Sequence, residues 1–101
     1  MNQGISVVCA VTSGLFASEY VVKIANKDTV LWEGAVDREF VTHINHDDVQ
    51  KERYIEGRLL ADLVEKYQDG TVLVELPSEG WSRGRRIQVP LAFIKPERLP
   101  A

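Results

Sequence analysis

Short runs of apolar residues, separated by polar turns, dominate the second half of the chain. Two such runs flank Asp69-Gly70, a dipeptide typical of two-residue β-hairpin turns. A third run covers 87–89 and stops at Pro90, and a last apolar patch lies at Phe93-Ile94. Short strands around tight turns predict a small, strongly bent antiparallel sheet.

The first half of the chain shows a similar pattern. The run Ile5–Val11 predicts a buried strand, and Tyr20–Ile24 alternates between two faces as a half-buried strand does. Asn26–Asp28 predicts a turn because Asn and Asp tolerate left-handed dihedrals, and Thr29–Glu33 follows as the partner strand. A weaker strand is expected over Val36–Ile44.

Residues 47–68 support two interpretations. Apolar residues recur there at helical spacing, and Asp47 with Gln50 resembles a capping box, so one interpretation is an amphipathic helix over 47–68 and an α+β fold. The other is a short helix from Asp47 to about Arg53, followed by a strand from Arg58, within an all-β fold. The apolar residues at helical spacing are Ile55, Leu59, Leu60, Leu63, Val64 and Tyr67.

An internal repeat favours the strand. The segment Val22–Glu33 aligns without a gap on Val64–Glu75, and both contain Thr-Val-Leu-x-Glu. Beyond them, Val36–Val41 resembles Val89–Ile94 once the loop Ser78–Arg86 is treated as an insertion. A duplicated unit is expected to adopt the same structure twice. We therefore expect an all-β chain with an internal duplication and at most one short helix.

The order strand, hairpin, strand, proline-initiated turn and last short strand resembles that of SH3-like small barrels. The turn is Pro90–Phe93, and the last strand is expected over Ile94–Leu99. The resemblance implies a small antiparallel barrel, or a pair of half-barrels, in which one helical turn separates the last two strands. At 101 residues the chain is expected to be a single domain, 1–101. The resemblance implies no function, because this fold carries many unrelated activities.

Composition restricts the classes of function. The chain has 12 Lys and Arg against 15 Asp and Glu, a formal net charge of −3, whereas nucleic-acid-binding domains are usually basic. The single cysteine, Cys9, lies in an apolar run and is expected to be a buried hydrophobe in a reducing compartment. The sequence shows no signal-peptide pattern and no run long enough to span a bilayer, so we expect a cytoplasmic protein without membrane contact.

The loop Ser78–Arg86 departs most from this acidic background. It contains Trp81 together with Arg83, Arg85 and Arg86. Arginine beside an exposed aromatic residue is enriched at protein–protein hot spots, and it also serves phosphate contact and base stacking. We expect a non-enzymatic interaction module that presents these four residues to a protein partner, with a nucleic-acid-binding barrel as the alternative. The purely structural interpretation is a solvated loop whose arginines pair with carboxylates.

Two histidines provide the remaining candidate chemistry. His43 and His46 lie with two carboxylates in one polar stretch, and a small enzyme with a site at these histidines is the third hypothesis. Their spacing matches no closed metal site, and the sequence indicates no metal, cofactor or catalytic residue. Apolar residues on both faces of the predicted strands, such as Leu60 and Val64, predict a sheet that is covered on both faces, either by the N-terminal strands or by a second subunit of a homo-oligomer.

Overall fold

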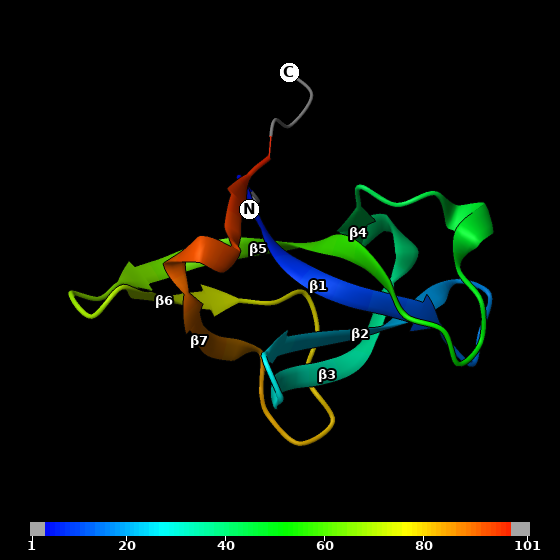
Figure 1. Cartoon of the computed structure of the whole chain (residues 1–101), viewed down its shortest axis with the longest axis horizontal. Helices are drawn as coiled ribbons and strands as arrows, with labels where there is room; N and C mark the ends of the chain where they lie inside the picture. Colours follow the sequence, from blue (N-terminus) through cyan, green and yellow to red (C-terminus); the bar gives the residue numbers. More distant parts are fainter. Residues whose placement is uncertain (1–3, 98–101) are drawn as a thin grey trace.

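The computed structural model describes residues 4–97, which form strands and three single 3-10 turns (Figure 1). The all-β class expected from the sequence is therefore confirmed. In chain order the elements are β1 (Ile5–Ser13), β2 (Glu19–Asn26), β3 (Thr29–Asp37), η1 (Arg38–Phe40), β4 (Val41–Thr42), η2 (His46–Asp48), β5 (Ile55–Lys66), β6 (Thr71–Glu75), β7 (Arg86–Pro90), η3 (Leu91–Phe93) and β8 (Ile94–Pro96).

All strand pairs are antiparallel, and six strands form a continuous order β3-β2-β1-β5-β6-β7. The two short strands lie outside this path, because β4 pairs with β5 and β8 pairs with β1. The end strands β3 and β7 contact each other, although no ladder joins them within residues 4–97. The result is a nearly closed small β-barrel, consistent with an SH3-like barrel (Figure 1).

The alternative helix over 47–68 is wrong, because β5 occupies most of that range. Residues 55–61 of β5 pair with residues 5–11 of β1, and Gly57, Leu59 and Ala61 are buried at a period of two. The helical spacing of apolar residues arises because Leu60 and Val64 lie on the less buried side of this strand. A strand with apolar residues on both faces imitates the spacing of a helix.

The chain contains the expected duplication, and the ladders of its two parts correspond apart from irregularities between Leu63 and Glu65 in β5 and between Ile24 and Ala25 in β2. A shift of 52 positions converts the β1–β2 pair Ala10–Lys23 into the β5–β6 pair Asp62–Glu75. A shift of 52 for Tyr20 and of 53 for Val36 converts this β2–β3 pair into the β6–β7 pair Val72–Val89. We call β1–β4 with η1 the first half, and β5–β8 with η3 the second half.

The sequence repeat locates this duplication only in part. The match of Val36–Val41 with Val89–Ile94 is confirmed, since both segments run from a third strand through a 3-10 turn into a short fourth strand. The match of Val22–Glu33 with Val64–Glu75 is wrong, because it aligns β3 with β6, whereas the ladders make β6 the equivalent of β2. Thr-Val-Leu-x-Glu recurs because it is a common pattern for a half-buried strand.

The two halves exchange their last strands. The first half's β4 pairs with β5 of the second half, and the second half's β8 pairs with β1 of the first. Val7 and Leu59 are both equivalent positions and direct cross-strand partners, so the approximate two-fold axis passes between them. Both side chains are fully buried, and the core surrounds them. The two half-barrels thus share one core and fold as an interlocked pair.

Three local predictions need correction. The short helix expected from Asp47 is a single 3-10 turn, η2, and its cap is Asn45, whose side chain accepts from the Asp47 N–H at 3.0 Å. The strand expected over 36–44 is interrupted by η1. In the β2–β3 turn, Lys27 adopts the left-handed conformation at φ 56° rather than either of its neighbours. The last strand ends at Pro96, and its expected end at Leu99 lies outside the described residues.

Candidate functional site

The loop between β6 and β7 is fastened to β3. Trp32 is buried on β3, and its Nε1 donates to the Gly84 carbonyl at 3.0 Å. The Trp81 N–H donates to the Glu33 carbonyl at 2.9 Å, and the Ser78 hydroxyl donates to the carbonyl of Ala35 at 2.8 Å. The loop therefore covers the outer edge of β3 and holds Trp81 in a fixed place.

Close approach to Trp32 requires glycine on both sides of the indole. A Cβ at Gly80 would lie 2.6 Å from Trp32 Nε1, and a Cβ at Gly34 would lie 3.0 Å from Trp32 Cη2. Contacts below about 3 Å are shorter than van der Waals separation, so alanine at Gly80 would displace the loop. Gly80 of the loop and Gly34 of β3 thus allow the loop to dock onto β3.

The three loop arginines have different environments. Arg85 donates from Nε to the Leu76 carbonyl at 3.3 Å and from Nη2 to the carbonyl of Pro77 at 3.1 Å. Arg86 pairs with Glu75, with 3.0 Å between Nε and Oε1. Arg83 is exposed and makes no hydrogen bond or ion pair with any of residues 4–97. Arg85 and Arg86 therefore stabilise the loop, and Arg83 is the arginine it presents to solvent.

Trp81 borders an apolar groove of about 520 Å³, which we call the Trp81 groove. The Trp81 side chain is 63% exposed, and across the groove Leu15 is 93% exposed. Phe16, next to Leu15 in the same loop, is 67% exposed. The floor is the outward face of β2 and β3 at Val21 and Ala35. The remaining lining residues are Ser13, Gly14, Glu19, Lys51 and Glu52.

The walls of the Trp81 groove come from the segments in which the two halves differ. The Trp81 loop, residues 76–85, takes the place of the two-residue turn between β2 and β3. The loop 14–18 is only one residue longer than its counterpart 67–70 between β5 and β6, and it differs from that counterpart by carrying Leu15 and Phe16. Lys51 and Glu52 belong to the connection between the halves, residues 43–54, which we call the linker. Framework strands alone would not form this groove, because the long Trp81 loop and the linker supply part of its walls.

The sequence prediction covered only one side of this groove. It identified Trp81 but gave no role to Leu15 and Phe16. The available signal was two adjacent large apolar residues in a short loop that begins at Gly14. Exposed apolar residues of that size are unusual when several gather at one site.

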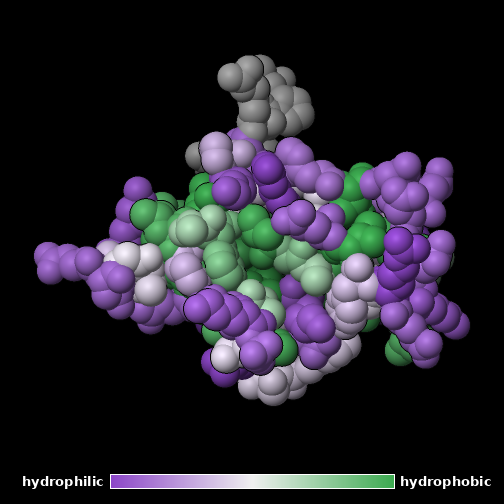
Figure 2. All heavy atoms as spheres, in the orientation of Figure 1, coloured by the Kyte–Doolittle hydropathy of each residue, from purple (hydrophilic) through white to green (hydrophobic). Residues whose placement is uncertain are grey.

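Tyr54 lines a second hollow. Its hydroxyl donates to Glu33 Oε2 at 3.2 Å, and Lys23 Nζ lies 4.1 Å from the centre of its ring. Burial raises the pKa of Tyr54, and the bonded, negatively charged Glu33 raises it further. The second hollow, about 370 Å³, includes Val8 and Ala10 of β1. In Figure 2 hydrophobic residues cross the middle of the visible face, in the region of β1, with hydrophilic residues around them.

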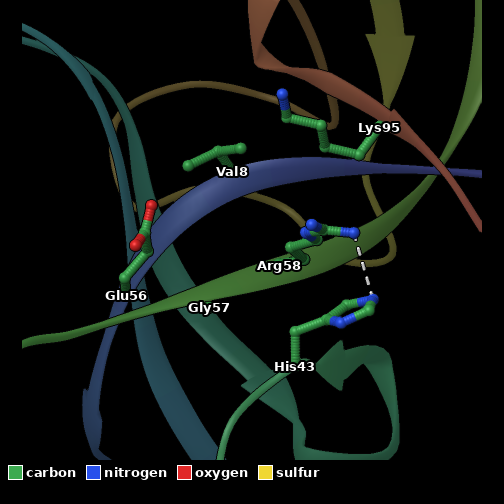
Figure 3. A pocket seen from close by; sticks show the side chains of 6 residues that line it. All are labelled: Val8, His43, Glu56, Gly57, Arg58 and Lys95. Carbon is green, nitrogen blue, oxygen red and sulfur yellow. Dashed lines mark hydrogen bonds between the residues drawn. The ribbon is translucent and has the colours of Figure 1, made fainter.

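His43 belongs to an ion-pair cluster at the end of β8. Its Nε2 lies 3.0 Å from Glu97 Oε2 and 3.1 Å from Nη1 of Arg58, and the Thr42 hydroxyl donates to Glu97 Oε1 at 2.9 Å. Burial would raise the pKa of Glu97, but the hydrogen bonds from His43 and Thr42 outweigh it and leave this pKa below its ordinary value. The adjoining hollow of about 230 Å³ is lined by Val8, His43, Glu56, Gly57, Arg58 and Lys95 (Figure 3).

His46 does not join this cluster. Its Nδ1 is hydrogen-bonded to the hydroxyl of Tyr20, and the two rings stack with centroids 5.6 Å apart. The two histidines thus contact different groups, and the structure does not bring them together into one site. No three His, Cys, Asp or Glu side chains within residues 4–97 are grouped so as to hold a metal ion.

Cys9 is buried in the core, and burial raises the pKa of its thiol to about 12, with the negative charge of Glu56 adding to the effect. The thiol is therefore protonated at neutral pH. A protonated, buried thiol is a poor nucleophile.

Comparison of the chain with protein-family models, with curated proteins and with solved structures finds no match. Among the residues that the structure describes, there is no helix of sufficient length and apolar character to cross a membrane.

Proposed function

We propose that this protein is a non-enzymatic interaction module that binds a protein partner in the Trp81 groove. One observation carries the proposal. The three most exposed large apolar side chains of residues 4–97 are Leu15, Phe16 and Trp81, and all three belong to the two loops that face each other across this groove. The Trp81 loop is an addition to the repeated framework, and the side chains of Leu15, Phe16 and Trp81 are not part of the shared core.

The groove favours a partner segment with one large apolar side chain and a carboxylate. The apolar side chain would lie between Leu15 and Trp81, above the small residues Val21 and Ala35. The carboxylate would reach Arg83, which has no ion-pair partner among residues 4–97. Tryptophan and arginine are the residue types that most often supply the binding energy of such contacts.

Nucleic acid is the less favoured partner. Affinity for nucleic acid comes mainly from cations that neutralise phosphates. Two of the three loop arginines are already bonded to Glu75 or to backbone carbonyls, and the net charge is −3. We expect no quenching of tryptophan fluorescence by single- or double-stranded oligonucleotides at low salt. Quenching that weakens steeply with added salt would favour the nucleic-acid alternative instead.

Site-specific photo-crosslinking tests the proposal. A photoreactive phenylalanine analogue replaces Phe16, which lies at the edge of the groove, and irradiation in the source cells is expected to give one discrete crosslinked protein. The matched control carries the analogue at Val30, an exposed strand residue away from the groove, and is expected to give none. Equal yields at both positions, or no product at position 16, would contradict the proposal.

We also propose that the protein acts in the cytoplasm. A single cysteine that stays protonated in the core is compatible with a reducing compartment. Fractionation of the source cells tests this location.

A further inference from the structure

The first half of the molecule has its own peptide segment bound at the end of its core. Two linker residues, Ile44 and Val49, pack against the core, and His46 stacks on the buried Tyr20. Gln50 adds backbone pairing, because its carbonyl accepts from the Thr12 hydroxyl at 2.7 Å and from the Ser13 N–H at 3.5 Å. The linker thus occupies the end of the first half as an extended ligand would.

The equivalent end of the second half has no such cover within residues 4–97. Val11 is fully buried, whereas its equivalent Leu63 is 42% exposed. Leu91 of η3, the equivalent of Arg38, is 50% exposed. Figure 1 shows that this end, at the β5–β6 hairpin, lies opposite the end that carries the linker. We call Leu63, Lys66 and Leu91 the open end.

The backbone at the open end has the same bonding capacity as its counterpart. The Tyr67 N–H donates to the Thr71 carbonyl, and Lys66 lies opposite Val72. Backbone groups alternate in direction along an antiparallel strand, so the Lys66 N–H points away from β6. Ser13, its counterpart after the β-bulge at Val64, directs its N–H to Gln50. The Lys66 N–H of the second half is therefore placed like the Ser13 N–H of the first half, which already donates to the Gln50 carbonyl.

Charge indicates what kind of segment fits. The Lys66 side chain shares the face of its cross-strand partner Val72 and so lies at the open end. The linker that fills the first half carries Asp47 and Asp48 in its 3-10 turn. An acidic segment of the same kind would meet a cation at the open end.

We propose that the open end binds an extended segment of a protein partner, with apolar side chains spaced as Ile44 and Val49 are and with a carboxylate facing Lys66. Its carbonyl would accept from the Lys66 N–H, as Gln50 accepts from Ser13. This site is separate from the Trp81 groove, and it is inferred from the internal repeat together with the exposed apolar residues and Lys66 at the open end.

A peptide derived from the linker is the probe. It has the sequence of Thr42–Glu52 with His46→Leu, because Val72 and Leu91 replace Tyr20 and Arg38 at the open end. Titrated into the isotope-labelled full chain, the peptide is expected to cause saturable NMR shifts at residues 63–66 and 91. Leu63→Lys is expected to weaken binding about tenfold or more. Trp81→Ala is expected to leave it unchanged, so this site and the proposed function fail independently.

Two controls keep the test decisive. Val30→Lys places the same charge on a strand residue of similar exposure and is expected to bind normally, and Leu91→Lys replaces Leu63→Lys if that variant does not fold. Shifts centred on Trp81, binding that survives Leu63→Lys, or no shifts at millimolar peptide would overturn the proposal. NMR contacts between residues 98–101 and Leu63 in the peptide-free chain would also overturn the proposal. So would a dimer, detected by sedimentation, whose interface contains Leu63, because in both cases the chain itself would fill the site.

Discussion

Trp32 links the fold to the candidate site at the scale of single residues. Its indole is buried in the core, while its Nε1 holds the loop that carries Trp81. One side chain therefore serves both the packing of the first half and the position of a loop from the second half. Gly80 and Gly34 leave room for this indole.

Replacing Trp32 by phenylalanine tests this double role. The variant keeps an aromatic ring but loses the hydrogen bond to Gly84 and part of the packed volume, so we expect a loss of about 1–3 kcal/mol in the free energy of unfolding. Urea denaturation measures the loss. The Trp81 amide is expected to exchange with solvent faster in the variant. Unchanged exchange at Trp81 would show that the loop does not depend on the indole.

Glu97 gives the stability of the fold a dependence on pH. Its pKa is lower in the folded chain than its ordinary value of 4.5, so its carboxylate stabilises the fold above that pH. This contribution is lost as the pH falls through the lower, folded-state pKa. We expect Glu97→Gln to be less stable than the wild type at pH 7, with the difference vanishing in strong acid.

Thermal unfolding of the wild type and Glu97→Gln from pH 7 to pH 2 measures this difference. Glu39→Gln, which alters an exposed carboxylate in η1, is the matched control. A difference between wild type and Glu97→Gln that stays constant over the whole range would contradict the role of the carboxylate charge.

At the scale of elements, β5 is, with β1, one of the two strands that join the halves. It pairs with β1, β4 and β6, and its buried Gly57 lies beneath the linker. A Cβ at Gly57 would lie 2.7 Å from Ile44 Cγ2 and 3.0 Å from Val11 Cγ2. This glycine lets the linker approach the core of the first half.

Gly57→Ala is therefore expected to destabilise the protein by about 1–3 kcal/mol through overpacking. Gly84→Ala is the matched control, because no atom lies within 4 Å of its added Cβ. Equilibrium denaturation of the two variants gives the comparison. Equal stability of both variants would mean that Ile44 and the linker move aside without cost.

The elements that sequence patterns predict well are those determined by local chemistry. Strands with one buried face alternate visibly, as Tyr20–Ile24 does, and Gly70 adopts φ 87° at the predicted hairpin turn. β5 was ambiguous because its apolar residues occupy both faces. The role of Arg85 was not predictable, since it depends on carbonyls that only the folded chain brings near it. The adjacent residues Leu15 and Phe16 could be noticed in the sequence, but their position opposite Trp81 depends on the fold.

At the scale of the whole molecule, the repeated strands form the barrel, and the features that differ between the two halves form the candidate binding surfaces. The shared ladders, repeated at a shift of 52 or 53 positions, form the interlocked half-barrels. The Trp81 loop, which breaks the repeat, forms one wall of the Trp81 groove. Within residues 4–97, no segment covers the end of the second half as the linker covers the first, and this leaves the open end. The positions at which two similar halves differ are therefore the candidate binding surfaces.

The affinity of the crosslinked partner for variants of the Trp81 groove tests this account most directly. With purified partner, calorimetric titration is expected to show binding weakened about 30-fold or more by Trp81→Ala, the loss typical of a hot-spot residue at about 2 kcal/mol. Arg83→Ala is expected to weaken binding, and Arg86→Ala, which alters the arginine paired with Glu75, to have little effect. Wild-type affinity in Trp81→Ala, in a variant shown to be folded, would contradict the assignment of this groove as the binding site.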